Sequence, residues 1–443
     1  MTAAERLYSR LVRRDADAES ALDPTVRAEL PPNGVRLVTA QALQSAGDQT
    51  VNASTVLTWL FHALGVPAGL AGLLVPIRES GSMLPQVFLT PLVMRVRGRR
   101  HVFAAGAWVQ AAAVAVMAFT AAVGTGLTAG VVILAALAVA ALGRCLCSIA
   151  SKDVQGRTVP KGERGQITGV STMVAGAVAL TLGLGIRLLG GDAPGTGALA
   201  ALLGLGAALW AISAIVYGRV REPEPPAPTT DDDDGAPGVA ARLASACRDD
   251  PQFRRFVTAR SLLLVSALSP PFILALALAA GTSGLSGLGG FILASGLAAL
   301  LGGRVFGRLA DRSSRLLMTG TALAASLVLL ALLGVLALTG GPEALGSGPA
   351  TEALFVGAYF LIAFIHTGVR VGRKTYVQDM AEGDRRTLYV AAGNTTLGVV
   401  LLVVGGISSA LAAVDPQWAV LFLALLGLAG VVTSWSLPEV SRG

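Results

Sequence analysis

The chain has 443 residues, of which 53% are hydrophobic and only 14% are charged. Soluble proteins carry about a quarter charged residues, so this composition excludes an ordinary soluble protein. The net charge of +7 does not indicate nucleic acid as a partner, because the basic residues gather in short segments between apolar runs, where they set membrane topology.

The first segment, residues 1–36, is rich in arginine and carboxylates and holds no apolar core of the signal-peptide type. Leu7 and Leu11 are interspersed with arginines, a pattern that favours a short basic amphipathic helix. Two interpretations stay open. Either the helix lies on an anionic membrane surface, or the segment is a plain cytoplasmic arm.

From residue 37 onward, apolar runs long enough to cross a bilayer recur, and they lack the alternation of barrel strands. We therefore predict an all-α polytopic membrane protein with twelve transmembrane helices. The predicted spans are residues 37–64, 68–94, 102–124, 127–151, 165–189, 196–218, 254–281, 285–308, 315–339, 352–375, 386–412 and 417–437.

Lysines and arginines outside the spans fall almost entirely in alternate loops. The positive-inside rule then places both termini in the cytoplasm and the protein in the inner or plasma membrane. The longest loop, residues 219–253, is rich in proline and contains the four aspartates 231–234. It predicts a solvated linker between residues 37–218 and 254–437, with a tail at 438–443. A cation-binding role for the aspartates is the alternative.

The two halves of the chain resemble each other. Residues 36–43 match 255–262 at an offset of 219, and residues 160–164 match 381–385 at an offset of 221. Nearly constant offsets in corresponding helices predict two pseudo-symmetric six-helix bundles that arose by duplication.

The first predicted span carries a polar stripe. Its members recur every three or four residues, which places them on one helix face: Gln41, Gln44, Asp48, Asn52 and Thr55. Inside a bilayer such a stripe faces protein or water. Hydrogen bonding between helices explains the amides, whereas burying a carboxylate costs more than such a bond returns. We therefore predict a functional role for Asp48.

The second predicted span contains Arg78 and Glu79 side by side. A charge at the centre of a membrane helix costs about 2.5–3.5 kcal/mol on insertion scales. Consecutive helical residues point about 100° apart, so these two do not pair fully with each other. We expect Arg78 to reach Asp48, and Glu79 to reach a basic group such as Arg144. A permanent ion-pair lock between helices is the alternative.

Further polar residues lie within other spans. His366 is either a satisfied core histidine or a proton carrier, and Arg260, Arg304 and Arg370 either face a cavity or snorkel to the membrane edge. From these patterns we predict proton coupling by Asp48 and Glu79, and substrate binding by Gln44, Asn52, Arg78, Arg144, His366 and Asn394.

Residues 307–315, Gly-Arg-Leu-Ala-Asp-Arg-Ser-Ser-Arg, resemble the loop signature of the major facilitator superfamily: a glycine, three residues, Asp-Arg and a basic cluster. In the first half, Pro91 stands in place of the glycine and Arg95 in place of the aspartate, before Gly98-Arg99-Arg100. The resemblance implies the two-bundle carrier fold (MFS fold) and alternating access around a midplane site. It also implies a cytoplasmic gate, whose matching positions are Arg95, Arg99, Asp311 and Arg312. Loop capping is the alternative role of Asp311.

No Gly-rich loop ending in Gly-Lys-Ser/Thr is present, so energy for transport has to come from a gradient. Excess buried arginine favours an anionic or zwitterionic substrate. We therefore predict a monomeric, proton-coupled secondary transporter whose partners are the lipid bilayer, a small-molecule substrate and protons. The alternatives are a multidrug or amphiphile exporter and a non-transporting sensor or assembly factor on a carrier fold.

An enzyme is not supported by the sequence. The histidines His62, His101 and His366 are scattered, and no metal-binding or Ser/His/Asp spacing occurs. Cys145 and Cys147 are interpreted as small buried thiols rather than metal ligands, and three cysteines give no disulfide framework. We predict no cofactor and no metal.

Overall fold

The chain forms a bundle of long helices. This computed structural model describes residues 3–12, 19–20, 24–160, 167, 170, 174, 176–181, 183–184, 195–223, 248, 250–282, 285–380 and 383–440. Every regular element among them is a helix, and the described residues contain eight helical segments long and apolar enough to cross a membrane, one of which, Pro251–Ala279, combines three consecutive helices. The predicted all-α membrane fold is thus confirmed. The fifth predicted span, 165–189, lies largely outside the described residues.

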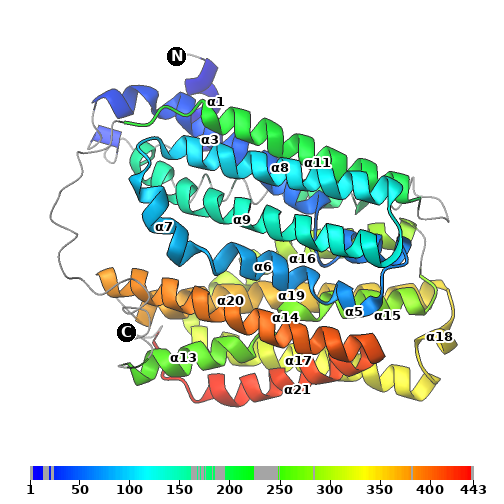
Figure 1. Ribbon diagram of the computed structural model, residues 1–443. Coiled ribbons are helices and arrows are strands. Elements are labelled where there is room, and N and C mark those ends of the chain that lie inside the picture. Colours follow the sequence, from blue (N-terminus) through cyan, green and yellow to red (C-terminus); the bar gives the residue numbers. More distant parts are fainter. Residues whose placement is uncertain are drawn as a thin grey trace.

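Helices from the first half of the chain pack against one another on one side of the bundle (Figure 1). Here α8 packs against α9 and α11, α3 packs against α11, and α6 packs against α9. The bounds are α1 Ala3–Leu11, α3 Pro24–Thr50, α4 Val56–Ala63, α5 Ala68–Ala71, α6 Leu74–Met83, α7 Gln86–Arg95, α8 Arg99–Val123, α9 Gly126–Thr158 and α11 Thr196–Gly218.

Helices from the second half of the chain occupy the other side. In this half α16 packs against α19, α17 packs against α19 and α21, and α13 packs against α20 and α21. The bounds are α13 Pro251–Leu262, α14 Val265–Leu268, α15 Pro270–Ala279, α16 Leu285–Arg312, α17 Ser314–Thr339, α18 Pro342–Leu345, α19 Pro349–Met380, α20 Gly383–Val414 and α21 Pro416–Trp435.

Three predicted spans are interrupted rather than continuous. The first is divided into α3 and α4, and in the gap the Asn52 side chain accepts a hydrogen bond from the Ser54 N–H at 2.9 Å. Such a local bond offers the backbone an alternative to the helix ladder. The second span is divided into α5, α6 and α7, and the seventh into α13, α14 and α15. Pro85 precedes α7 and Pro270 begins α15, and proline cannot donate to a preceding turn.

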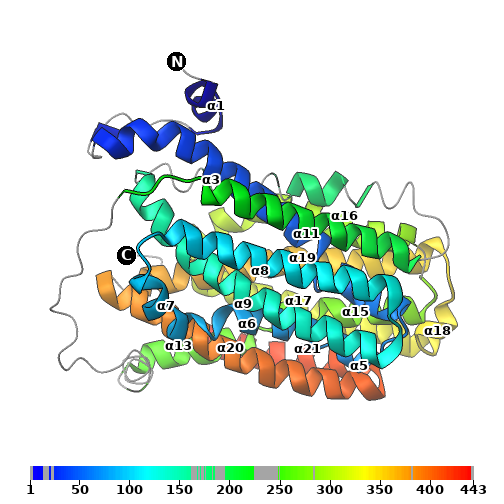
Figure 2. The same ribbon diagram turned by 45° about the horizontal axis from the view of Figure 1, so that its top comes forward.

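The N-terminal segment packs on the bundle. Helix α3 begins at Pro24, well before the predicted start at residue 37, and α1 lies beside its first turns (Figure 2). Tyr8 and Val12 are buried. The Asn33 amide donates to the Arg221 carbonyl at 2.7 Å, and its Oδ1 accepts from the Arg221 N–H at 2.9 Å. These contacts fasten the start of α3 to the segment that follows α11.

The two halves touch most closely where α5 and α6 meet α20. Ser80 Oγ donates to the Gly398 carbonyl at 2.8 Å, and Ser409 Oγ donates to the Gly69 carbonyl. The backbones approach so closely that a Cβ built on Gly69 would lie 2.8 Å from the Cβ of Ala413. Helix α4 packs against α15 at the same end. Both chain termini lie at the opposite end of the bundle (Figure 1), so the end away from the termini is closed by direct helix contact.

Candidate functional site

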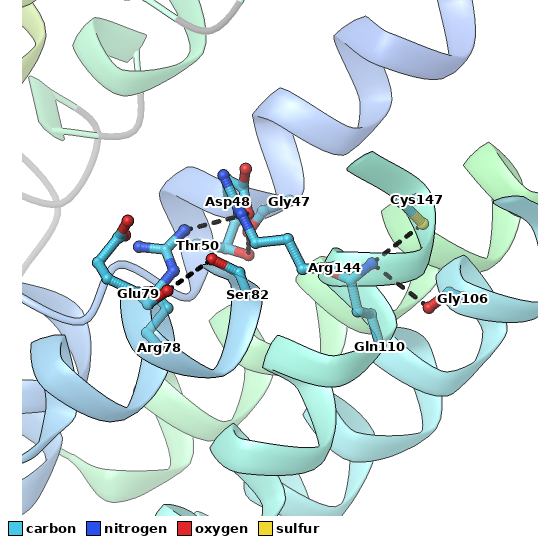
Figure 3. Close-up of polar contacts among 10 residues, drawn as sticks. All are labelled: Gly47, Asp48, Thr50, Arg78, Glu79, Ser82, Gly106, Gln110, Arg144 and Cys147. Atoms are coloured by element: carbon cyan, nitrogen blue, oxygen red, sulfur yellow. Dashed lines mark hydrogen bonds and ion pairs between the residues drawn. The ribbon is translucent and has the colours of Figure 1, made fainter. Parts of the chain in front are cut away.

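The strongest polar cluster lies inside the first half and centres on Asp48, two residues before α3 ends. Its Oδ1 atom accepts hydrogen bonds from Arg78 Nη2 of α6 at 3.1 Å and from Arg144 Nη1 of α9 at 2.6 Å (Figure 3). Three separate helices therefore converge on one carboxylate oxygen. The predicted contact between Asp48 and Arg78 is confirmed.

The partner predicted for Arg144 is wrong. Arg144 makes its ion pair with Asp48 rather than with Glu79. In the part of the chain that the structure describes, no basic group lies within 4 Å of the Glu79 carboxylate. Glu79 nevertheless acts electrostatically on Arg144 and on Arg373 of α19. Glu79 thus interacts at longer range with a cation of each half, and it forms an ion pair with neither among the described residues.

The cluster is partly open to solvent. The side chains of Arg78, Asp48 and Arg144 are 17%, 21% and 32% exposed. A small cavity borders all three, and Gln110 and Trp210 also line it. The cavity has a volume of about 20 Å³, measured as the space open to the centre of a water molecule. That is enough for about one water. The ion-paired side chains therefore border a small space that aliphatic side chains such as Val51 and Leu137 also line.

Two predicted members of the polar stripe leave the helix face. Because α3 ends at Thr50, Asn52 and Thr55 lie in the gap before α4 and do not continue the face that carries Asp48. The Asn52 carbonyl oxygen is used by the local turn, and Thr55 Oγ1 is buried without a hydrogen-bond partner among the described residues. Gln44 remains on α3, half-buried, one turn before Asp48. The break that removes Asn52 had one signal in the sequence, the Asn-Ala-Ser-Thr run that favours turns.

The predicted residues of the second half do not join the Asp48 cluster by hydrogen bonds. His366 Nδ1 of α19 lies 3.2 Å from Ser266 Oγ of α14. Asn394 Oδ1 of α20 accepts from Arg260 Nη2 of α13 at 2.8 Å. Arg260, for which the sequence allows either a cavity-facing or a snorkelling position, is buried, with 7% of its surface exposed.

Of the four predicted gate residues, the structure describes the side chains of Arg99 and Arg312. Arg99 is buried and its Nη1 donates to Asp153 Oδ2 at 2.9 Å, and Arg157 Nε joins the same oxygen at 3.0 Å. The Arg99 N–H also donates to the Glu222 carboxylate at 3.2 Å. These contacts tie α8 to α9 and to the segment after α11. Arg312 is exposed at the end of α16, and the side chains of Arg95 and Asp311 lie outside the described residues.

Two other features of the described structure, an apolar groove and a pair of cysteines, are weaker candidates for a functional site. A groove of about 680 Å³ between α16, α17 and α19 is lined mainly by apolar side chains such as Phe306 and Phe364, as expected of a surface facing acyl chains. Cys145 and Cys147 are free and buried. Among the described residues, no three histidine, cysteine, aspartate or glutamate side chains lie together as metal ligands would.

A bundle of apolar helices with paired charges inside it has the organisation of a multi-pass membrane transporter. Comparison of the sequence with known families gives a more specific assignment. The chain belongs to the Major Facilitator Superfamily, whose family model matches residues 37–342, more than half of the chain. The resemblance of the 307–315 loop pointed to the same family. No curated protein sequence matches this chain.

Solved structures with the same fold are transporters. A POT family transporter in complex with 5-aminolevulinic acid has a TM-score of 0.67 at 11% identity, covering 90% of this chain and 94% of that one. The nucleoside transporter NupG has a TM-score of 0.68 at 12% identity, with 91% and 99% covered. A D-xylose-proton symporter has a TM-score of 0.65 at 12% identity, with 92% and 98% covered. At such identities the likeness shows the fold.

Proposed function

We propose that this protein is a proton-coupled secondary carrier, not an enzyme, for a small anionic or zwitterionic organic solute. It works by alternating access in the inner or plasma membrane, with both termini cytoplasmic. The observation that carries the proposal is the convergence of Arg78 and Arg144 on Asp48, next to Glu79, which forms no ion pair among the described residues. Structural neighbours support it, since one was solved with 5-aminolevulinic acid and another is a proton symporter.

The charges of the cluster favour an anionic group on the substrate. Two guanidinium groups face a single carboxylate, and both converge on the same oxygen of Asp48. Each guanidinium has five N–H donors, so both keep unused donors after this contact. A substrate carboxylate can take those donors in the bidentate geometry that arginine favours. Arg144 has the most exposed side chain of the three, at 32%. We therefore assign to Arg144 the first contact with the substrate carboxylate.

Glu79 is the better candidate of the two predicted proton carriers. Protonating Asp48 would weaken its contacts with both Arg78 and Arg144. Protonating Glu79 breaks no ion pair among the described residues. A substrate anion bound at Arg144 brings negative charge towards Glu79, and a proton on Glu79 relieves that repulsion. Anion and proton then bind together, which is the requirement for symport.

The contacts between the halves support an assignment of this structure to one state of the transport cycle. The contact of Ser80 with Gly398 joins the halves midway along α20, and the contact of Ser409 with Gly69 joins them at the end away from the termini. If the termini are cytoplasmic, this end is the extracellular one, and the Asp48 cluster is reached from the cytoplasm. The proposed cycle requires the α5, α6 and α20 contacts to separate while the opposite end closes.

Proton flux in liposomes tests the proposal. Purified protein is reconstituted with a pH-sensitive dye inside, and organic acids including 5-aminolevulinic acid are added outside. We expect at least one acid to drive proton movement with the wild-type protein and much less with Arg144→Gln. A flux that Arg144→Gln leaves intact would remove the site from the account. Absence of flux with every acid would favour the exporter or sensor alternatives.

A further inference from the structure

A second group of cations lies in the other half of the molecule. Arg260 of α13 is 7% exposed, and its Nε atom has no hydrogen-bond partner among the described residues. Within the same residues no carboxylate lies within 4 Å of this guanidinium. A second guanidinium, Arg373 of α19, lies close enough to act on it electrostatically. A buried and a half-buried cation near one another are unfavourable unless an anion accompanies them.

Helix α20 is shaped to receive the Arg260 guanidinium. A Cβ built on Gly393 would lie 2.8 Å from Arg260 Nη1, so a side chain at this position would displace the guanidinium group. The next residue, Asn394, accepts from Arg260 Nη2 at 2.8 Å with its Oδ1 atom. That bond fixes the direction of the amide and leaves its Nδ2 donor without a partner among the described residues. Arg260 and Asn394 therefore each hold an unused donor at the meeting point of α13 and α20.

The position of this group suits a solute that moves between the two halves. Counting about 1.5 Å per residue, Arg260, Arg373 and Asn394 lie roughly 10–17 Å from the helix ends on the side of the termini. The carboxylate that acts on Arg373 across the molecule is Glu79, from the first half. An anion bound here would share Arg373 with Glu79.

We propose that Arg260, Arg373 and Asn394 form an oxyanion site in the second half, which takes the carboxylate, sulfonate or phosphate group of the transported solute. The assignment of this anion to the transported solute rests on the proposed carrier function, whereas the anion site itself stands on its own geometry. Guanidinium and amide N–H groups are the donors that such oxygens need. An anion bound at this site supplies a negative charge next to Arg260, which forms no ion pair among the described residues, and next to the half-buried Arg373.

Anion binding is measured on the full-length protein in a neutral detergent without added phospholipid, so that no lipid phosphate competes. Sodium sulfate and sodium acetate are the probes, and sodium chloride at matched ionic strength is the control. We expect both probes to raise the melting temperature more than chloride does. Arg260→Gln and Arg373→Gln should each weaken binding by about tenfold or more, as the loss of a charged hydrogen bond implies. Arg254→Gln, an exposed arginine on the same helix, should bind like wild type.

Two further variants keep the test decisive where a glutamine variant fails to fold. Asn394→Asp places a carboxylate next to the Arg260 guanidinium. We expect this variant to have a higher melting temperature and no response to sulfate or acetate. Gly393→Ala should displace the guanidinium and weaken binding with the charge retained. The proposed site would be contradicted if sulfate stabilised all variants equally. It would also be contradicted if chloride stabilised the protein as much as sulfate does. Because no gradient is used, a carrier that fails to couple protons would leave this result standing.

Discussion

Arg144 donates to the Asp48 carboxylate at 2.6 Å, joining two helices whose contacting residues are 96 positions apart in the chain. The same carboxylate oxygen holds Arg78 at 3.1 Å. Ion pairs inside a membrane protein are costly to form, and they are strongly destabilising when one partner is removed. Stability measurements therefore report directly on this cluster.

Asp48→Asn should strongly destabilise the first half. It leaves two guanidinium groups without a negative partner in a site that is only 17–32% exposed. We expect the free energy of unfolding to fall by about 2–4 kcal/mol, somewhat less than for a fully buried pair because of that exposure. Denaturant unfolding in detergent measures the change. Glu343→Gln on the exposed α18 is the matched control, and an equal effect of both variants would contradict the prediction.

A double-mutant cycle separates the partners of Arg144. For Asp48→Asn combined with Arg144→Gln we expect a coupling energy of about 1–3 kcal/mol, because the two side chains are in direct contact. For Glu79→Gln combined with Arg144→Gln the coupling should be below about 0.5 kcal/mol, because that interaction acts at longer range. Unfolding of the five proteins against wild type gives both values. A larger coupling for the Glu79 pair would mean that Arg144 exchanges partners in the resting protein.

The Arg99–Asp153 pair should hold the first half together. Arg99 is nearly fully buried and donates to Asp153 Oδ2 at 2.9 Å. We expect Asp153→Asn to cost about 2–4 kcal/mol of stability, because it leaves a buried cation. The exchanged pair, Arg99→Asp with Asp153→Arg, should recover part of this loss. Thermal unfolding measures both, and a charge exchange no better than the single change would argue against a paired role.

The closed end should need to open in every cycle. A Cβ on Gly69 would lie 2.8 Å from the Ala413 Cβ, and a disulfide requires about 3.5–4.5 Å, so a small separation of the helices suffices. In a Cys247→Ser background, we expect Gly69→Cys with Ala413→Cys to cross-link on oxidation and to stop transport until reduced. Gel mobility and uptake are followed together. Full transport by the cross-linked protein would contradict alternating access through this end.

The sequence predicts the fold class well and the partners of individual charges less well. Long apolar runs report burial in a bilayer directly, so the membrane helices follow from composition. The Asp48–Arg78 contact also follows, because both residues lie on polar faces of neighbouring spans. The rotation of α9 that brings Arg144 to Asp48 depends on packing between helices, which no local pattern records. The same holds for Arg260, which is buried beside Gly393 and Asn394 of α20.

Proton coupling by Glu79 is the central claim of the proposed carrier function, and uptake measurements test it directly. An acid found in the flux screen is followed in two assays with wild-type and Glu79→Gln protein: uptake driven by a pH gradient, and exchange of labelled for unlabelled solute without a gradient. We predict that Glu79→Gln loses gradient-driven uptake by about tenfold or more while exchange persists, because the substrate site is intact and only the proton carrier is gone. Gradient-driven uptake that survives Glu79→Gln and is lost only in Asp48→Asn would contradict the assignment of the coupling proton to Glu79.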